Sequence, residues 1–138
     1  MQHLEFHVDT GGRRGLWDLT AACERFAAEA STGGDGLLVV FVPHATAGIV
    51  VVELGAGSDA DLLAAFDRLL PRDERLYRHR HGSPGHGADH LVPLLAPSSL
   101  TVPVIGGRLT LGTWQSIALF DPNPDNDRRL VRLSFVSG

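Results

Sequence analysis

Strand patterns dominate both ends of the chain. In residues 3–8 (HLEFHV), Leu4, Phe6 and Val8 alternate with polar neighbours, which is typical of a half-buried strand. The run Leu37–Val42 is continuously apolar, and it predicts a central strand that is covered on both faces. Further strands are predicted at Ile49–Leu54, Leu100–Ile105, Leu109–Leu111, Ser116–Phe120 and Leu130–Val136, with a hairpin turn at Gly106-Gly107.

Two longer segments have the helical period. In Leu16–Ala30, apolar residues at spacings of three and four form one stripe, which consists of Leu16, Leu19, Cys23, Phe26 and Ala30. A second helix is predicted to begin at Ser58, with Asp61 placed nearly as in a capping box, and to end before Pro71. Its buried stripe would be Leu62, Leu63, Phe66, Leu69 and Leu70.

Between the second helix and the C-terminal strands, the chain is polar and rich in Gly and His. We expect a loop over Tyr77–Asp89, with a short strand at residues 77–79 as one alternative, and a short helix over Ala88–Leu95. Strands predominate, most of them joined by short turns, with two helices inserted. This order predicts an antiparallel α+β fold, and the 138 residues suit one domain spanning residues 1–138.

Composition excludes several kinds of function. The chain has no lysine, so a Schiff-base lysine and a Walker A lysine are both excluded. The one cysteine, Cys23, lies on the apolar side of a predicted helix and is expected to be a buried hydrophobic residue. A net charge of −4 argues against nucleic-acid binding. No long apolar run and no signal-peptide pattern is present, so we expect no membrane partner and a cytoplasmic location.

The histidines are the clearest candidates for chemistry. Four of the seven lie within twelve residues: His79, His81, His86 and His90. His79 and His81 would point to the same side of an extended segment. His86 and His90 have the spacing of a helical metal pair, although Pro84, Gly85 and Gly87 argue against a helix through His86. The cluster predicts metal binding or acid–base chemistry, and the alternative is a solvated loop that carries histidines.

Other polar residues have two interpretations each. Glu53 ends a strand of Val and Ile, where it either faces solvent or serves a site. The segment Gly112–Gln115 (GTWQ) forms either a packed corner or a ligand contact. Arg128 and Arg129 either pair with the acidic loop Asp121–Asp127 or bind an anion.

Four motifs, in order, resemble the YjbQ-type family, also called the secondary thiamine-phosphate synthase family. The similarity runs from about Gly15 to the C-terminus. The motifs are SSLTVPVIGGRLTLGTWQSI at residues 98–117, HATAGIVVVE at residues 44–53, YRHRHGSPGHGADHL at residues 77–91, and Arg128-Arg129-Leu130-Val131. Two positions depart from the family's pattern: Val52 stands where the family has Asn, and Ala45 where it has Thr.

The resemblance implies a fold and a site. The expected fold is α+β, mostly an antiparallel β-sandwich with two main helices, assembled as a homotrimer. His44, His79 and His90 would bind a divalent metal ion, zinc, with Glu53 as the matching acid. His86 corresponds to a position that is sometimes His in the family, whereas His81 has no firm counterpart.

The resemblance also implies a weak activity of the thiamine-phosphate synthase type. We therefore expect a metal-dependent enzyme acting on a small, phosphorylated substrate. Its catalytic residues would be Glu53 and Gln115, and its substrate would contact His86, Arg128 and Arg129. Two alternatives remain: a non-catalytic metal- or ligand-binding homotrimer, and a purely structural histidine cluster.

Overall fold

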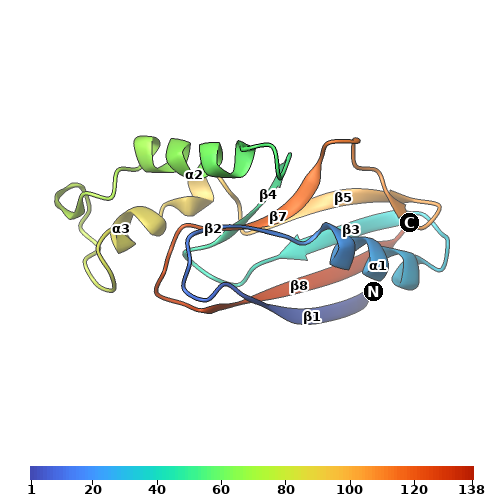
Figure 1. Ribbon diagram of the computed structural model, residues 1–138. Helices are drawn as coiled ribbons and strands as arrows, with labels where there is room; N and C mark the ends of the chain where they lie inside the picture. Colours follow the sequence, from blue (N-terminus) through green and yellow to red (C-terminus); the bar gives the residue numbers. More distant parts are fainter.

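The computed structural model describes residues 1–138 as two antiparallel sheets (Figure 1). The larger sheet has the order β1-β8-β3-β5-β6 and the smaller one β2-β7-β4. This confirms the predicted antiparallel α+β class. The strands are β1 (Gln2–Asp9), β2 (Gly15–Asp18), β3 (Gly36–Phe41), β4 (Gly48–Val52), β5 (Ser99–Ile105), β6 (Arg108–Leu109), β7 (Ser116–Asp121) and β8 (Arg128–Ser137).

The helices lie at opposite ends of the molecule (Figure 1). Helix α1 (Thr20–Ser31) lies near both chain termini, whereas α2 (Ser58–Leu69) and the short α3 (His86–Asp89) lie at the far end. Two 3₁₀ turns, η1 (Glu74–Leu76) and η2 (Val92–Leu94), flank α3. None of the helices is long and apolar enough to cross a membrane.

The middle strand of the smaller sheet, β7, is buried on both of its faces. Ile117 and Leu119 of β7 face the larger sheet and α1, where they join a core of 17 buried residues. Phe120 faces the other way and packs edge-on against Phe66 of α2, at a ring-centroid distance of 5.2 Å. Full burial of a side chain of this size contributes roughly 1.5–3 kcal/mol. The small second core therefore fixes α2, and with it the chain that follows α2, against the smaller sheet.

The strand that is covered on both faces is β7, and the expectation for Leu37–Val42 was wrong on this point. Leu38 and Val40 of β3 are fully buried, but Leu37 is 44% and Phe41 37% exposed. The apolar run extends over both faces of β3 although no other layer of this chain covers its outer face. The continuous run of apolar residues therefore did not indicate a strand that is covered on both faces.

Both predicted helices are present, with corrections at their ends. Leu16–Asp18 forms β2 and pairs with β7, so the first helix begins only at Thr20. Leu16 has the spacing of the helical stripe, but it packs in the second core. The second helix follows Gly57 without a side-chain cap, so no capping box forms, and Leu69 of its predicted stripe is 65% exposed.

The histidine-rich segment contains more helix than predicted and no strand at residues 77–79. A one-turn helix, α3, begins at His86 itself, against the expectation from the neighbouring glycines. Gly85 adopts a φ of 90°, which is open to glycine, and so turns the chain directly into α3. The helix predicted at Ala88–Leu95 is divided between α3 and η2, because the chain leaves α-helical geometry before Pro93.

A buried ion pair joins the two sheets. Arg129 of β8, only 1% exposed, donates from Nε and Nη2 to the carboxylate of Asp121 at the end of β7, at 2.6 and 2.8 Å. A third bond runs from Arg129 Nη2 to the Thr46 hydroxyl, at 3.0 Å. The pairing of this arginine with the acidic segment was one of its two predicted interpretations. Its neighbour Arg128 makes a surface pair with Asp9 at 3.0 Å.

Replacing Asp121 with Asn should strongly destabilise the fold, because the Arg129 charge would remain buried without a counter-charge. We expect a loss of about 3–5 kcal/mol in the free energy of unfolding, measured by urea denaturation. Arg128→Gln is the matched control, and it should change stability by less than about 1 kcal/mol because its ion pair is exposed. Equal effects of the two substitutions would contradict this account.

Candidate metal centre

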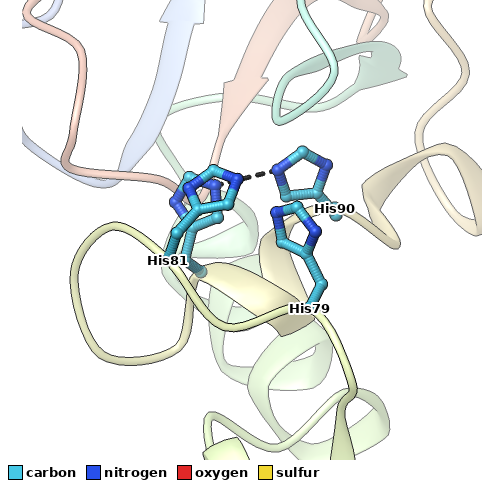
Figure 2. A group of neighbouring side chains, drawn as sticks. His79, His81 and His90 are labelled. Carbon is cyan, nitrogen blue, oxygen red and sulfur yellow. Dashed lines mark hydrogen bonds between the residues drawn. The ribbon is translucent and has the colours of Figure 1, made fainter.

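Four histidine side chains converge at the end of the molecule that carries α3. His79 and His81 come from the loop before α3, His86 is its first residue, and His90 follows it directly. One ring nitrogen from each lies within 4.8 Å of the others. Figure 2 shows the rings of His79, His81 and His90 close together. His86 Nε2 and His90 Nε2 are 2.8 Å apart. The four-histidine cluster can hold a metal ion.

Local structure accounts for the convergence. A turn of α3 places His86 and His90 on the same side, because residues four apart are neighbours on a helix surface. The backbone N–H of His90 donates to the carbonyl of His86 at 3.2 Å, which extends the helical pattern through His90. His79 and His81 approach from the facing loop, with a ring-centroid distance of 4.1 Å. Both are exposed, whereas His86 is buried.

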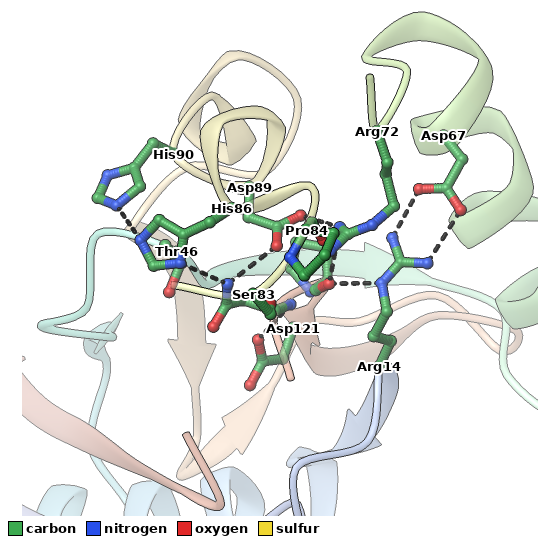
Figure 3. Close-up of polar contacts among 12 residues, drawn as sticks. Arg14, Thr46, Asp67, Arg72, Ser83, Pro84, His86, Asp89, His90 and Asp121 are labelled. Atoms are coloured by element: carbon green, nitrogen blue, oxygen red, sulfur yellow. Dashed lines mark hydrogen bonds and ion pairs between the residues drawn. The ribbon is translucent and has the colours of Figure 1, made fainter. Parts of the chain in front are cut away.

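The β7–β8 loop contacts the histidine cluster and the residues around it. Figure 3 shows Arg72, Asp89, His86 and His90 in this region. Asp125 Oδ2 lies 2.6 Å from His86 Nδ1, and the Asp125 carboxylate also accepts from the backbone N–H of Ser83. Asn123 Nδ2 donates to Asp89 Oδ2 at 2.9 Å. The other oxygen of Asp89 accepts from Arg72, the residue that follows α2 and Pro71. Three segments far apart in sequence thus meet beneath the histidines.

Electrostatics favour neutral rings at His79 and His90 and an ionised carboxylate at Asp125. Desolvation lowers the pKa of both His79 and His90, and the neighbouring histidines lower it further. Desolvation raises the pKa of Asp125, but hydrogen bonds from Ser83, His86 and Asn123 outweigh it, and the pKa falls well below its usual range. Burial raises the pKa of Asp89, against the opposing hydrogen bonds from Arg72 and Asn123. Neutral imidazole is the form that binds metals.

The donor set fits a borderline divalent ion. Zinc bound at about 2.0–2.1 Å by tetrahedral imidazoles would place the ligand nitrogens roughly 3.3 Å apart. The 4.8 Å within which the four nitrogens lie can therefore close by modest side-chain rotation. The carboxylate on the far nitrogen of His86 is the usual partner of a metal-binding histidine. All donors are nitrogens, which suits zinc, copper or nickel better than magnesium or calcium.

The cluster contains His79 and His90, two of the three histidines expected as metal ligands, but not His44. His44 lies between β3 and β4, where its Nε2 accepts from the backbone N–H of Leu130 at 2.9 Å. His86, expected at the substrate, is a cluster member. The participation of His81, which has no firm counterpart in the family's pattern, was signalled by the clustering of four histidines and by its H-x-H pairing with His79.

The other predicted site residues lie elsewhere. Gln115 closes its own turn by accepting from the backbone N–H of Gly112 at 2.8 Å, and Glu53 is exposed just after β4. Arg128 and Arg129 make the ion pairs described above. Their proposed roles stay predictions. Sequence reasoning missed Asp125, Asn123, Asp89 and Arg72. Asp89 lies within the third motif, between His86 and His90, whereas the other three residues lie outside the four motifs.

Comparison with known proteins identifies the family. The chain matches the family described as "UPF0047 protein YjbQ-like" over residues 4–137. The chain belongs to the UPF0047 (YjbQ-like) family. The resemblance noted from about Gly15 onward thus extends almost to the N-terminus.

Members of the UPF0047 family resemble the chain over nearly its whole length. The UPF0047 protein of Mycobacterium tuberculosis H37Rv is 60% identical over 131 residues, which cover 95% of each chain. UPF0047 protein YugU of Bacillus subtilis is 36% identical, with 80% of this chain and 81% of YugU covered. The crystal structure of a hypothetical protein from Aeropyrum pernix K1 has 30% identity and a TM-score of 0.88, and each chain is covered completely.

The stability of this UPF0047 protein should fall as the pH drops through about 6.5, partly because of His44. Burial and the nearby Arg129 lower its pKa, so the folded chain resists a proton that the unfolded chain accepts. Protonation would also oppose the bond from Leu130. We expect His44→Gln, which keeps an acceptor but does not titrate, to reduce the loss of unfolding free energy between about pH 7.5 and 5.5. Urea denaturation at several pH values measures this loss.

His3→Gln, an exposed histidine of β1, is the matched control for this experiment. The slope of stability against pH should be reduced in the His44 variant relative to this control. An unchanged slope in His44→Gln would contradict a half-buried, neutral His44.

Proposed function

We propose that this chain binds one divalent metal ion, zinc, through its four-histidine cluster, and that it is a metal-dependent enzyme acting on a small, phosphorylated substrate. The observation that supports this most directly is the convergence of four ring nitrogens within 4.8 Å, with a carboxylate behind one of them. A purely structural cluster of histidines would not need that carboxylate. When bound, zinc would supply a Lewis acid for a phosphoryl oxygen.

The exposure of the ligands favours catalysis over a closed structural site. Structural zinc sites use four protein ligands, whereas catalytic sites use three and keep one position open. His86 and His90 lie on and beside α3, and His86 is buried, whereas His79 and His81 stand on an exposed loop. We propose that His79, His86 and His90 are the lasting ligands and that the place of His81 is open to exchange with substrate.

Charge near the site supports an anionic substrate. Arg78 and Arg80 alternate with His79 and His81, and both arginines are exposed. The chain has no lysine, so a phosphate group would be bound by arginine, by backbone N–H groups or by the metal. These exposed arginines join Arg128 as candidate substrate contacts, whereas Arg129 is buried in its ion pair with Asp121. A transfer of the thiamine-phosphate synthase type, which releases pyrophosphate, is one reaction that such a site would suit.

Metal content of the untagged protein, measured by mass spectrometry without chelators, should be about one zinc ion per chain. His90→Ala should lose it, because only two of the three lasting ligands, His79 and His86, would remain and the contact of His86 with His90 would be gone. His44→Ala is the discriminating control: the four-histidine cluster predicts that it keeps its metal, whereas a site of His44, His79 and His90 predicts loss. Full occupancy in the His90 variant would overturn the assignment.

A second candidate function is a non-catalytic, metal- or ligand-binding homotrimer. It is favoured by apolar residues on the uncovered outer face of the larger sheet, a feature typical of subunit interfaces. These residues are Leu37, Phe41, Ile105 and Val136. Light scattering would give the oligomeric state. Stoichiometric zinc without turnover on phosphate esters or diphosphates would favour this candidate over the enzyme.

A further inference from the structure

His86 differs from the other three histidines of the cluster in having a carboxylate partner. Its Nδ1 lies 2.6 Å from Asp125 Oδ2, and its Nε2 faces His90 Nε2 at 2.8 Å. His79, His81 and His90 have no carboxylate within hydrogen-bonding distance. The carboxylate of Asp125 thus contacts the cluster through the ring of His86 alone.

Asp125 is itself held in place. Its carboxylate accepts from the backbone N–H of Ser83 at 3.1 and 3.2 Å, which ties it to the turn just before α3. Its own backbone N–H donates to the side-chain carbonyl of Asn123 at 3.0 Å. Asn123 is fully buried and donates to the buried Asp89 of α3. The carboxylate is therefore positioned by the same helix that carries His86.

This contact determines which nitrogen of His86 carries the proton. A carboxylate that is ionised at neutral pH only accepts, so Nδ1 donates in this 2.6 Å contact, and the longer contact of 3.2 Å between the Asn123 amide nitrogen and the same Nδ1 is then not a hydrogen bond. The neutral ring then has its lone pair on Nε2, which points into the cluster. In that tautomer, a proton on His90 Nε2, 2.8 Å away, is shared with this lone pair in the metal-free chain. A metal ion would take the place of this proton between the two rings.

The close approach of His86 and Asp125 requires a glycine beside it. A Cβ on Gly82 would lie 2.4 Å from His86 Nδ1 and 2.5 Å from Asp125 Oδ2. Gly82 also has a φ of +78°, which other residues rarely adopt. Any side chain at this position would collide with both His86 and Asp125. A substitution of Gly82 should therefore separate these two side chains while leaving both in the sequence.

We propose that Asp125 is the positioning residue of the metal site: it fixes the tautomer and orientation of His86 so that Nε2 is presented to the ion. This inference rests on the proposed function, and it adds a residue of the β7–β8 loop, 39 positions from His86, to the machinery of the site. Asp125 does not contact the ion in this arrangement and acts only through His86.

Asp125→Asn should weaken zinc binding about 10–100-fold, the usual effect of removing the partner of a metal-binding histidine. Zinc affinity would be measured by competition with a chromophoric chelator. Asp127→Asn is the matched control from the same loop, because the Asp127 side chain makes no hydrogen bond or ion pair, and it should leave the affinity unchanged. The free energy of unfolding of each variant, measured without metal, distinguishes a variant that has lost stability from one in which only the positioning of His86 is lost.

The tautomer of His86 provides a second measurement. It would not change if Asp125 had only a structural role. In the metal-free protein, long-range ¹H–¹⁵N NMR should show His86 protonated on Nδ1 in the native chain. In Asp125→Asn, the proton should shift in part to Nε2, because an amide can donate to Nδ1 as well as accept from it. Cobalt substitution should likewise alter the visible absorption of this variant.

Gly82→Ala provides a perturbation that leaves every polar group in place. It should weaken zinc binding as Asp125→Asn does, because its methyl group separates His86 from Asp125. Gly55→Ala is the control: Gly55 has a comparable φ of +86°, but a Cβ there meets nothing within 4 Å. It should impose similar backbone strain without loss of zinc affinity.

The outcomes separate this inference from the proposed function. If the native chain binds no zinc, both fail. If it binds zinc and His90→Ala does not, but Asp125→Asn and Gly82→Ala bind as tightly as the native chain, only the positioning role of Asp125 is overturned. Zinc loss in both variants, together with the tautomer shift, is the result that supports it.

Discussion

The buried ion pair between Arg129 and Asp121 is the constraint on which the site depends. Asp121 ends β7 in the smaller sheet and Arg129 lies at the start of β8 in the larger one, so the pair clamps the two sheets together. It also fixes both ends of the loop between these strands. That loop delivers Asn123 and Asp125 to the histidines. Removing two charges from water is costly, so this pair is better understood as fixing one geometry than as adding stability.

Two arginine side chains, Arg14 and Arg72, connect other segments of the chain to the residue that follows Asp121. Arg14 makes two bonds to Asp67 of α2, at 2.6 and 3.0 Å, and one to the carbonyl of Pro122. Arg72 reaches Asp89, the carbonyl of Pro122 and the carbonyl of Pro84. A planar guanidinium can serve several acceptors at once, which an ammonium does less well. The second helix, the histidine loop and the β7–β8 loop are thereby held by two side chains.

The sequence predicted best what depends on local pattern. The period of β1, the hairpin at Gly106-Gly107 and the histidine spacing all concern neighbouring residues, and all reappear in the structure. Predictions failed where distant contacts decide the outcome. Leu16 fits a helical stripe, yet pairing with β7 makes it part of a strand. The contact between Asp125 and His86 spans 39 residues, and no motif in the single sequence announces it.

The histidines themselves show how far the site is preformed. His86 is fixed by α3 and by Asp125, and His90 by its position one turn later, so half of the cluster belongs to the folded framework. His79 and His81 stand on an exposed loop without secondary structure, and their only ring neighbours are other histidines. Bringing these two rings into a tight set costs conformational entropy that imidazole contacts alone do not offset. A metal ion would offset it, so binding the ion and ordering the loop would be one event.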